Sequence, residues 1–128
     1  MIFSEGLKKN RDFQQVYRKG SSKANKYLVL YVQKQDTGKN RIGISVSKKV
    51  GNSVVRHRVK RLIKESYRLN ENKFDRGLDL VVVARPGAKE KSFFEIESAL
   101  LHLGKYHNIL NGICRENRKE GENEVFIN

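Results

Sequence analysis

The sequence predicts one α+β domain, a sandwich of helices on a small sheet in the order α-β-β-α-β-α. The chain has 128 residues, the usual size of one domain with its own core. Segments with helical and with strand-like apolar patterns follow one another along it. Because no repeat or linker divides these segments, we expect a folded domain over residues 1–110 and a polar, flexible tail over residues 111–128.

A short helix is predicted over residues 9–19. Val16 and Tyr17 lie three and four residues after Phe13, which places all three side chains on one face of a helix. Gly20 follows at a position where glycine often ends a helix.

Two strands are predicted next. Residues 26–34 are rich in aromatic and β-branched side chains, which favour strands. Residues 41–47 alternate strictly, with aliphatic side chains on one face and polar or small residues on the other,. A turn over residues 36–40 separates the two segments. We expect them to form an antiparallel hairpin.

A longer helix is predicted over residues 53–69, capped by Asn52 or Ser53 and ended by Asn70. Its expected core face consists of Val55, Val59, Leu62, Ile63 and Ser66. The nearly continuous apolar run at residues 78–84 is typical of a buried strand. Ser92 and Glu95 have the spacing of a capping box, which opens a last helix. Its apolar stripe consists of Phe93, Ile96, Leu100 and Leu103.

The charge distribution indicates a polyanionic partner. Lys and Arg number 27 against 14 acidic residues, a net charge of +13, which opposes the compact state of so small a domain. Residues 41–68 contain nine of the basic residues and one acidic residue, whereas residues 71–128 contain nine and ten. The middle of the chain is therefore expected to bind nucleic acid, with a membrane surface as the second candidate.

No segment predicts export or membrane insertion. The first residues lack the basic flank and apolar run of a signal peptide, and no apolar stretch approaches the roughly 18–20 residues that span a bilayer. The one cysteine, Cys114, excludes an internal disulfide. No group of Cys and His has the spacing of zinc ligands. We expect a cytoplasmic protein.

The outer face of the helix at residues 53–69 is almost purely cationic. Basic side chains repeat four residues apart, as in Arg56/Lys60 and Lys60/Lys64, where like charges repel,. A polyanion would relieve this repulsion, so the face predicts contacts to nucleic-acid phosphates. Its residues are Arg56, His57, Lys60, Arg61, Lys64 and Arg68, with Arg58 at the edge.

The second face of the two predicted strands resembles a stacking platform for unpaired bases. It carries aromatic, small and hydroxyl side chains, namely Tyr27, Val29, Tyr31, Gly43, Ser45 and Ser47. Phe13 and Tyr17 could wall this platform or could be ordinary core residues, and composition leaves both interpretations open.

The stretch at residues 41–65 (RIGISVSKKVGNSVVRHRVKRLIKE) resembles the signature of the bacterial ribonuclease P protein subunit. That signature is an RNR triplet on a basic helix, followed by a lysine–arginine pair. Residues 7–20, 24–26 and 81–86 resemble the first helix, the entry to the first strand and the last strand of the family. The resemblance covers about residues 7–103. The one departure is His57, at the position of the asparagine in the triplet.

The resemblance implies a large catalytic RNA as the partner, which cuts precursor tRNA at its mature 5′ end. Magnesium would be bound mainly by that RNA, and the protein alone would hold no metal and supply no catalytic residue. The family fold has a mixed sheet and a left-handed βαβ crossover through the basic helix, although about 98% of such crossovers are right-handed.

The implied contacts form two surfaces. The residues expected to bind the catalytic RNA are Lys48, Lys49, Asn52, Arg56, His57, Arg58, Lys60, Arg61, Lys64 and Arg68. The residues expected to hold the single-stranded 5′ leader of precursor tRNA, in a cleft between the first helix and the sheet, are Phe13, Tyr17, Val29, Tyr31, Ser47, Lys48 and Arg85. No DNA, no membrane and no obligate protein partner is expected.

Three other functions remain open from the residues alone. A protein-only nuclease needs clustered carboxylates or a histidine pair, whereas Asp75 and Asp79 lack companions and the three histidines are scattered. A ribosomal or other structural RNA-binding protein would carry a similar helix. A DNA-binding helix could enter a major groove, although this face lacks the Asn and Gln that are typical of base reading.

Overall fold

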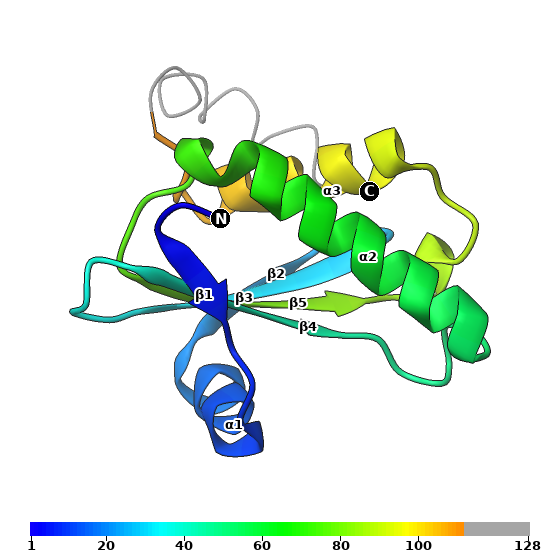
Figure 1. Ribbon diagram of the computed structural model, residues 1–128, viewed down its shortest axis with the longest axis horizontal. Coiled ribbons are helices and arrows are strands. Elements are labelled where there is room, and N and C mark those ends of the chain that lie inside the picture. The colour runs from blue at the N-terminus through cyan, green and yellow to red at the C-terminus, as the bar shows by residue number, and fades with distance from the viewer. Residues whose placement is uncertain (112–128) are drawn as a thin grey trace.

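The sheet of this protein is five-stranded and mixed, with the order β1-β4-β5-β3-β2. A computed structural model describes residues 1–111. The strands are β1 (Ser4–Gly6), β2 (Ser21–Ala24), β3 (Leu28–Lys34), β4 (Asn40–Ser45) and β5 (Leu78–Ala84). The helices are α1 (Asn10–Lys19), α2 (Ser53–Asn70) and α3 (Phe93–Tyr106), with short 3₁₀ turns at Glu71–Lys73 and Pro86–Ala88. Helices α2 and α3 cover one face of the sheet, and α1 lies on the other (Figure 1).

The expected hairpin between the segments at 26–34 and 41–47 is wrong. Strand β5 lies between them, antiparallel to β3 and parallel to β4. Six of the seven residues of β5 are buried, and a strand that is apolar on both faces is most stable at the centre of a sheet covered on both sides. The connection from β3 to β4 therefore does not join neighbouring strands: it leaves room between them for β5.

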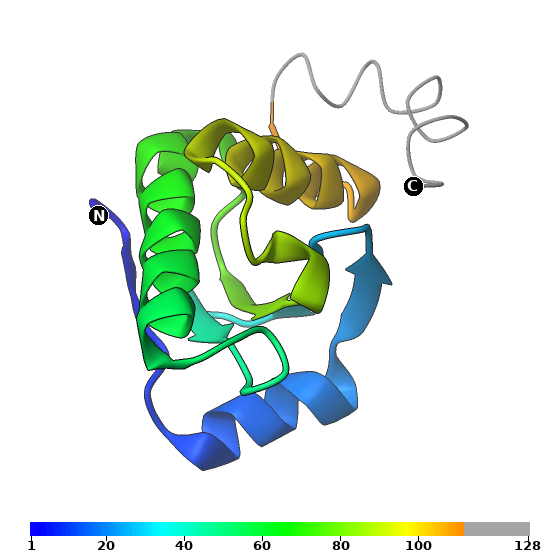
Figure 2. The ribbon, with the colours of Figure 1, turned by 90° about the vertical axis from the view of Figure 1, so that its right-hand side faces the viewer.

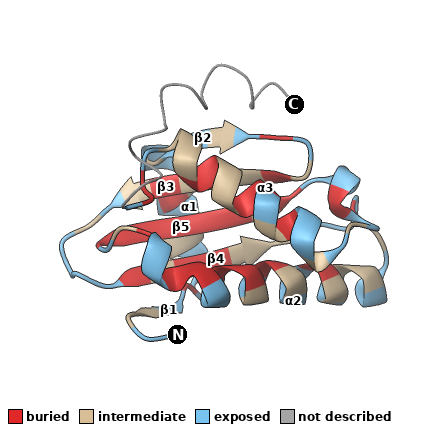
Figure 3. Ribbon diagram, turned by 90° about the horizontal axis from the view of Figure 1, so that it is seen from above, coloured by how far each residue is buried: buried red, intermediate tan, exposed pale blue. Residues whose placement is uncertain are grey.

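The connection from β4 through α2 to the parallel strand β5 is a left-handed crossover (Figures 1 and 3). Seen from the side of α2 and α3, α2 lies over the β4 edge, and β5 is on the side that the general rule disfavours,. The fold class expected for this chain is confirmed in this respect and in its mixed sheet.

The core has two parts, one on each face of the sheet. On the side of α2 and α3, Leu80 and Val82 of β5 pack with Ile63 and Tyr67 of α2. On the other side, Val81 packs with Val16 of α1. Alternate residues of β5 thus enter different apolar layers, which explains why its sequence is apolar without alternation.

Helix α2 buries the face that its sequence predicts. Val59, Ile63 and Ser66 are buried, while Val55 and Leu62 are partly buried against the same core. Tyr67 is also fully buried, and its hydroxyl accepts a hydrogen bond from Asn40 at 3.1 Å. The predicted N-cap is Asn52, whose side-chain oxygen accepts from the Val55 amide at 3.0 Å,.

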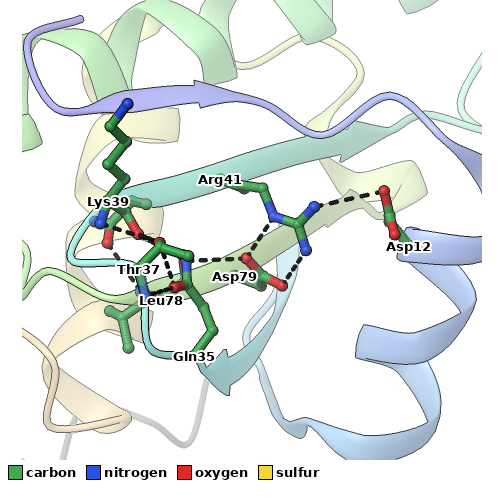
Figure 4. A network of polar contacts seen from close by, with 8 residues as sticks. Asp12, Gln35, Thr37, Lys39, Arg41, Leu78 and Asp79 are labelled. Atoms are coloured by element: carbon green, nitrogen blue, oxygen red, sulfur yellow. Dashed lines mark hydrogen bonds and ion pairs between the residues drawn. The ribbon is translucent and has the colours of Figure 1, made fainter.

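Helix α1 is tied to the sheet by an ion-pair network (Figure 4). The Arg41 guanidinium donates to both carboxylate oxygens of the buried Asp79, at 2.9 and 2.7 Å, and lies 3.5 Å from Asp12 of α1. The hydrogen bond with Asp79 raises the pKa of Arg41 above its ordinary value, and the nearby carboxylates add to this. The network fixes the start of α1 over β4 and β5.

The N-terminal segment is held beside α2 (Figure 2). The buried Glu71 carboxylate accepts hydrogen bonds from the amides of Ile2 and Phe3, at 2.7 and 3.0 Å. Burial raises the pKa of Glu71, but hydrogen bonds from Ser4 and these two amides, together with the terminal amine, bring that pKa below its ordinary value. This contact places β1 in parallel register with β4.

At two boundaries of the fold, Gly20 and Asn111, the structure differs from expectation. Gly20 has an extended backbone with φ of −82°, so it does not end α1 by a left-handed turn; a Cβ there would lie 2.7 Å from the Val16 oxygen. Asn111, placed in the tail, donates from its amide to the Lys73 carbonyl at 2.9 Å. The rest of the predicted tail, with Cys114, lies outside the described residues. Within residues 1–111, no helix has the length and apolar character needed to cross a bilayer.

Candidate nucleic-acid interface

The cationic face of α2 is formed by Arg56, His57, Lys60, Arg61, Lys64 and Arg68. Four of its basic side chains, those of Lys60, Arg61, Lys64 and Arg68, are exposed, and so is His57. No acidic residue lies in the first turn of the helix. The loop before α2 adds Lys48 and Lys49, which are both exposed. The predicted RNA-binding residues thus lie on α2 and on the loop that leads into it, a strongly basic segment that suits phosphates,.

Arg58 has a structural contact of its own. Its guanidinium donates to the carbonyl of Lys91 at 2.9 Å and more weakly to that of Lys89 at 3.4 Å. It therefore holds the loop between the 3₁₀ turn Pro86–Ala88 and α3 against the start of α2. This contact brings the backbone of the loop with Lys89 and Lys91 beside the start of α2, whereas the Lys91 Nζ itself lies over the Tyr27 ring.

Two other arginines of the predicted set are less available to phosphates, one because it is ion-paired and one because it is partly buried. The Arg68 guanidinium donates to the Glu65 carboxylate, with Nε at 2.8 and 3.0 Å from the two oxygens. That hydrogen bond lowers the pKa of Glu65 and raises the pKa of Arg68. Arg56 buries its Nε without a hydrogen-bond partner among the described residues. Lys60 and Lys64, both exposed, are the residues of this face best placed to meet phosphates.

Three aromatic side chains gather on the opposite face of the sheet. We call Phe13 and Tyr17 of α1 and Tyr31 of β3 the aromatic cluster. The ring centroids of Tyr17 and Tyr31 are 4.9 Å apart in an edge-on arrangement, and those of Phe13 and Tyr17 are 6.4 Å apart. All three are partly exposed and pack against the small apolar core of this face. They contribute to this core and stay partly exposed, so the geometry is compatible with both interpretations left open by the sequence.

Gly43 of β4 is what allows Phe13 to lie on the sheet. A Cβ at this position would lie 2.5 Å from Cζ of the Phe13 ring and 2.8 Å from Cε2. Such contacts are far below van der Waals distance, so any side chain here would displace the ring. The glycine in the alternating segment therefore fixes the position of the aromatic cluster relative to β4.

The other residues predicted to bind the leader lie on strands of the same sheet or directly after them. Val29 is partly exposed and pairs with Val83 of β5. Ser47 and Lys48 are exposed just after β4. Arg85 is exposed just after β5, and one of its nitrogens donates to the Asn25 carbonyl at 2.7 Å.

Tyr27 does not belong to the platform, contrary to expectation. It packs against the main core on the side of α3, and Lys91 Nζ lies 5.1 Å from its ring centroid. The reason is that Tyr27 precedes β3 in a bend, so the alternation of the strand does not extend to it.

A groove joins the two surfaces at the β4 edge. It has a volume of about 540 Å³, and its lining includes Phe13 of the aromatic cluster together with Lys60 and Lys64 of the cationic face. Strand β1 pairs with β4 only as far as Ile42, and Ile42 and Ile44 also line this groove. Lys8, which the sequence analysis did not include, lies at its other side. A single nucleic-acid strand could therefore contact both surfaces at once.

The residue types that a protein-only nuclease would use are not gathered into a metal-binding group within residues 1–111. Within residues 1–111, no group of three or more His, Cys, Asp or Glu side chains could hold a metal ion. Asp79 is paired with Arg41. His57 lies on α2, whereas His102 and His107 lie on or beside α3, and burial lowers the pKa of both.

Comparison with known proteins finds a family model and relatives that match most of this chain. The family model described as Ribonuclease P matches residues 3–107. The ribonuclease P protein component of Lachnoclostridium phytofermentans is 61% identical over 107 residues, covering 84% of this chain and 92% of that protein. The same component of Alkaliphilus metalliredigens is 63% identical over 97 residues, covering 76% and 87%.

Solved structures agree in fold. The Staphylococcus aureus RNase P protein superposes with a TM-score of 0.75 at 38% identity, covering 83% of this chain and 97% of that one. The Thermotoga maritima RNase P protein superposes with a TM-score of 0.73 at 31% identity, covering 78% and 94%. The family match includes the cationic face, the aromatic cluster and the groove between them.

Proposed function

The chain belongs to the ribonuclease P protein family, and we propose that it binds both the catalytic RNA of that enzyme and the 5′ leader of precursor tRNA. The coarser conclusion, that it is a protein component of ribonuclease P, follows from the family. The groove that joins the cationic face to the aromatic cluster is the observation that carries the finer proposal.

In this proposal, the catalytic RNA lies along the cationic face. Lys60, Arg61 and Lys64, with Lys48 and Lys49 of the preceding loop, meet its phosphates and release condensed counterions. Arg56, His57 and Arg68 border the contact. Asn52 and Arg58 contribute mainly by position, because Asn52 caps α2 and Arg58 holds the loop that carries Lys89 and Lys91.

The single-stranded leader lies on the aromatic cluster. Bases stack on aromatic rings whatever their sequence, with about 1–3 kcal/mol per base, which suits a leader that differs from one precursor to another. Val29 extends the apolar surface, while Ser47, Lys48 and Arg85 lie at its ends, where they can meet the sugar–phosphate backbone. A strand that leaves the cleavage site would reach this surface through the groove.

The chemistry belongs to the RNA. Magnesium ions, held mainly by the RNA, supply the activated water and stabilise the leaving oxygen when bound. The residues of this chain reduce the repulsion between the two RNAs and hold the substrate in place. We expect this work to take place in the cytoplasm.

The test is a reconstitution with a bacterial ribonuclease P RNA at low magnesium. We expect the protein to stimulate 5′ cleavage of precursor tRNA that has a leader of several nucleotides, and trimming the leader to remove most of this stimulation. Phe13→Ala with Tyr31→Ala should reduce the affinity for the long-leader substrate by roughly 10- to 100-fold, as the loss of about one stacked base predicts. Phe94→Ala, on the far side of the molecule, is the control.

Two results would contradict the proposal. Equal losses for substrates with and without a leader would remove the aromatic cluster from leader binding. Tight RNA binding without any stimulation of cleavage would favour a ribosomal or other structural RNA-binding protein.

A further inference from the structure

A second groove lies on the side of the molecule that carries α3. It has a volume of about 620 Å³, within the range of 300–1,000 Å³ that is usual for binding pockets. Its lining is mostly apolar and includes Tyr27, Phe94, Ala99, Leu101 and Leu110. It contains no residue of the cationic face or of the aromatic cluster, so RNA binding does not account for it.

Phe94 makes this groove unusual for a protein surface. Its side chain is 75% exposed on the first turn of α3, at the border of the groove. An exposed aromatic ring beside an apolar groove is typical of a surface that another segment covers. Three lysines, Lys26, Lys73 and Lys105, line the groove against one acidic residue, Glu95. A segment that covers the groove should therefore be both apolar and acidic.

The last part of this chain starts at the groove. Leu110 lines it and pairs with Phe74 in an isolated β-bridge. The next residue, Asn111, is hydrogen-bonded to Lys73, itself a lining residue. Residues 112–128 continue from this point, which fixes one end of them at the rim of the groove.

The sequence of that last part has the required composition. Glu120, Glu122 and Glu124 are spaced two residues apart and are followed by the apolar run Val125–Phe126–Ile127. The apolar run suits the lining formed by Phe94, Ala99 and Leu101, and the three carboxylates are opposite in sign to the net positive charge of the groove.

We propose that residues 120–128 dock into the groove of their own chain. The intervening residues 112–119 span at most about 27 Å when extended, which is ample because they leave from the rim. For a linker of this length the effective concentration is in the millimolar range. Docking therefore needs only a weak contact, and it covers Phe94.

The first test compares the full chain with a chain ending at residue 119, by amide chemical shifts. We expect truncation to shift the amides of Phe94, Ala99 and His102, and to leave those of β4 unchanged. A synthetic peptide of residues 120–128 should restore the shifts in the truncated chain with a Kd below about 1 mM, the concentration that the tether would supply. The same peptide with Phe126→Asp should fail to do so.

Variants of the groove provide the matched controls. Ser98→Arg places a long side chain across the groove from an exposed position, and Phe94→Ala removes the ring. Both should weaken peptide binding at least 10-fold. Leu69→Ala, which removes a 56% exposed apolar side chain elsewhere, should leave it unchanged.

Three outcomes would overturn the proposal. The first is identical amide shifts in the full and truncated chains. The second is a truncation effect that appears only at concentrations where sedimentation shows dimers, which would assign the groove to the tail of a second copy. The third is an equal loss of ribonuclease P RNA affinity in both chain lengths when Lys26, Lys73 and Lys105 are changed to Glu, which would make the groove an RNA site.

Discussion

At the scale of the residue, Glu71 links the N-terminal segment to the rest of the molecule. Its carboxylate accepts two amide hydrogen bonds at a buried site, and its pKa is lower in the folded protein than in the unfolded chain. The resulting stabilisation is fully present above the unfolded pKa of about 4.3 and is lost as the pH falls through the lower folded pKa.

We therefore expect Glu71→Gln to lower the free energy of unfolding at pH 7 by about 1–3 kcal/mol, because a charged acceptor with two oxygens is replaced by a neutral one. The difference from the unchanged protein should shrink as the pH falls below about 4. Urea titrations at several pH values measure both effects. Glu90→Gln, in an exposed loop, should show neither.

Gly43 gives a second prediction for a single residue. A methyl group at this position meets the Phe13 ring at 2.5 Å, so we expect Gly43→Ala to destabilise the protein by about 1–3 kcal/mol. It should also weaken binding of the long-leader substrate. Gly6→Ala is the matched control, because its Cβ would have only Lys8 within 4 Å, at 3.8 Å. Equal stability of the two variants in urea would show that Phe13 does not rest on β4.

At the scale of the element, the cationic face of α2 determines the salt dependence of RNA binding. Each phosphate contact contributes about 0.7–0.9 to the slope of log K against log salt concentration. Lys60→Ala with Lys64→Ala should therefore make the slope shallower by roughly 1.5. Lys34→Ala with Lys39→Ala, a pair of exposed lysines at the other end of the sheet, should leave the slope as it is. Filter-binding or fluorescence titrations over a salt series measure it.

Elements with local signals could be predicted from the sequence. The helix at Ser53–Asn70, the strand at Leu78–Ala84 and the capping box at Ser92 are confirmed within about one residue, because periodicity and capping depend on near neighbours in the chain. Strands β1 and β2 were missed, since they have three and four residues and no buried side chain. The position of β1 also depends on a distant contact, that of Glu71 with the N-terminal amides, whereas β2 forms a local antiparallel pair with β3.

In the candidate site too, features with a local sequence signal could be predicted and features that depend on distant contacts could not. The cationic face could be predicted because charge repeats within one helix. The contact of α2 with the loop before α3 could not be predicted, because the hydrogen bonds of Arg58 with that loop join residues more than thirty positions apart. The alternation misplaces Tyr27 for a related reason: where a strand begins depends on its partner strand, and β3 begins at Leu28 rather than at residue 26.

At the scale of the whole molecule, the net charge of +13 opposes the folded state when no RNA is bound. The screening length falls from about 10 Å at 0.1 M salt to about 3 Å at 1 M. We expect the Tm of the free protein to rise by a few degrees over this range, since about 1 kcal/mol corresponds to roughly 4 °C for a domain of this size. The Tm of the double variant Lys60→Glu with Lys64→Glu should rise less over the same salt range, because its net charge is lower. A Tm that does not change with salt would show that self-repulsion has little weight.

The position of β5 also bears on how the protein is made. During translation, β3 and β4 are complete before β5 exists, and neither pairs with the other in the finished sheet. At about 5–20 residues per second, the ribosome needs roughly two to seven seconds to extend the chain from Ser45, the end of β4, to Leu78,. For that interval the nascent sheet consists of two separate halves with unpaired edges. The central strand is the last strand to be synthesised, so the two halves join only when β5 pairs with both of them. A chain that stalls before Leu78 therefore cannot form the complete sheet.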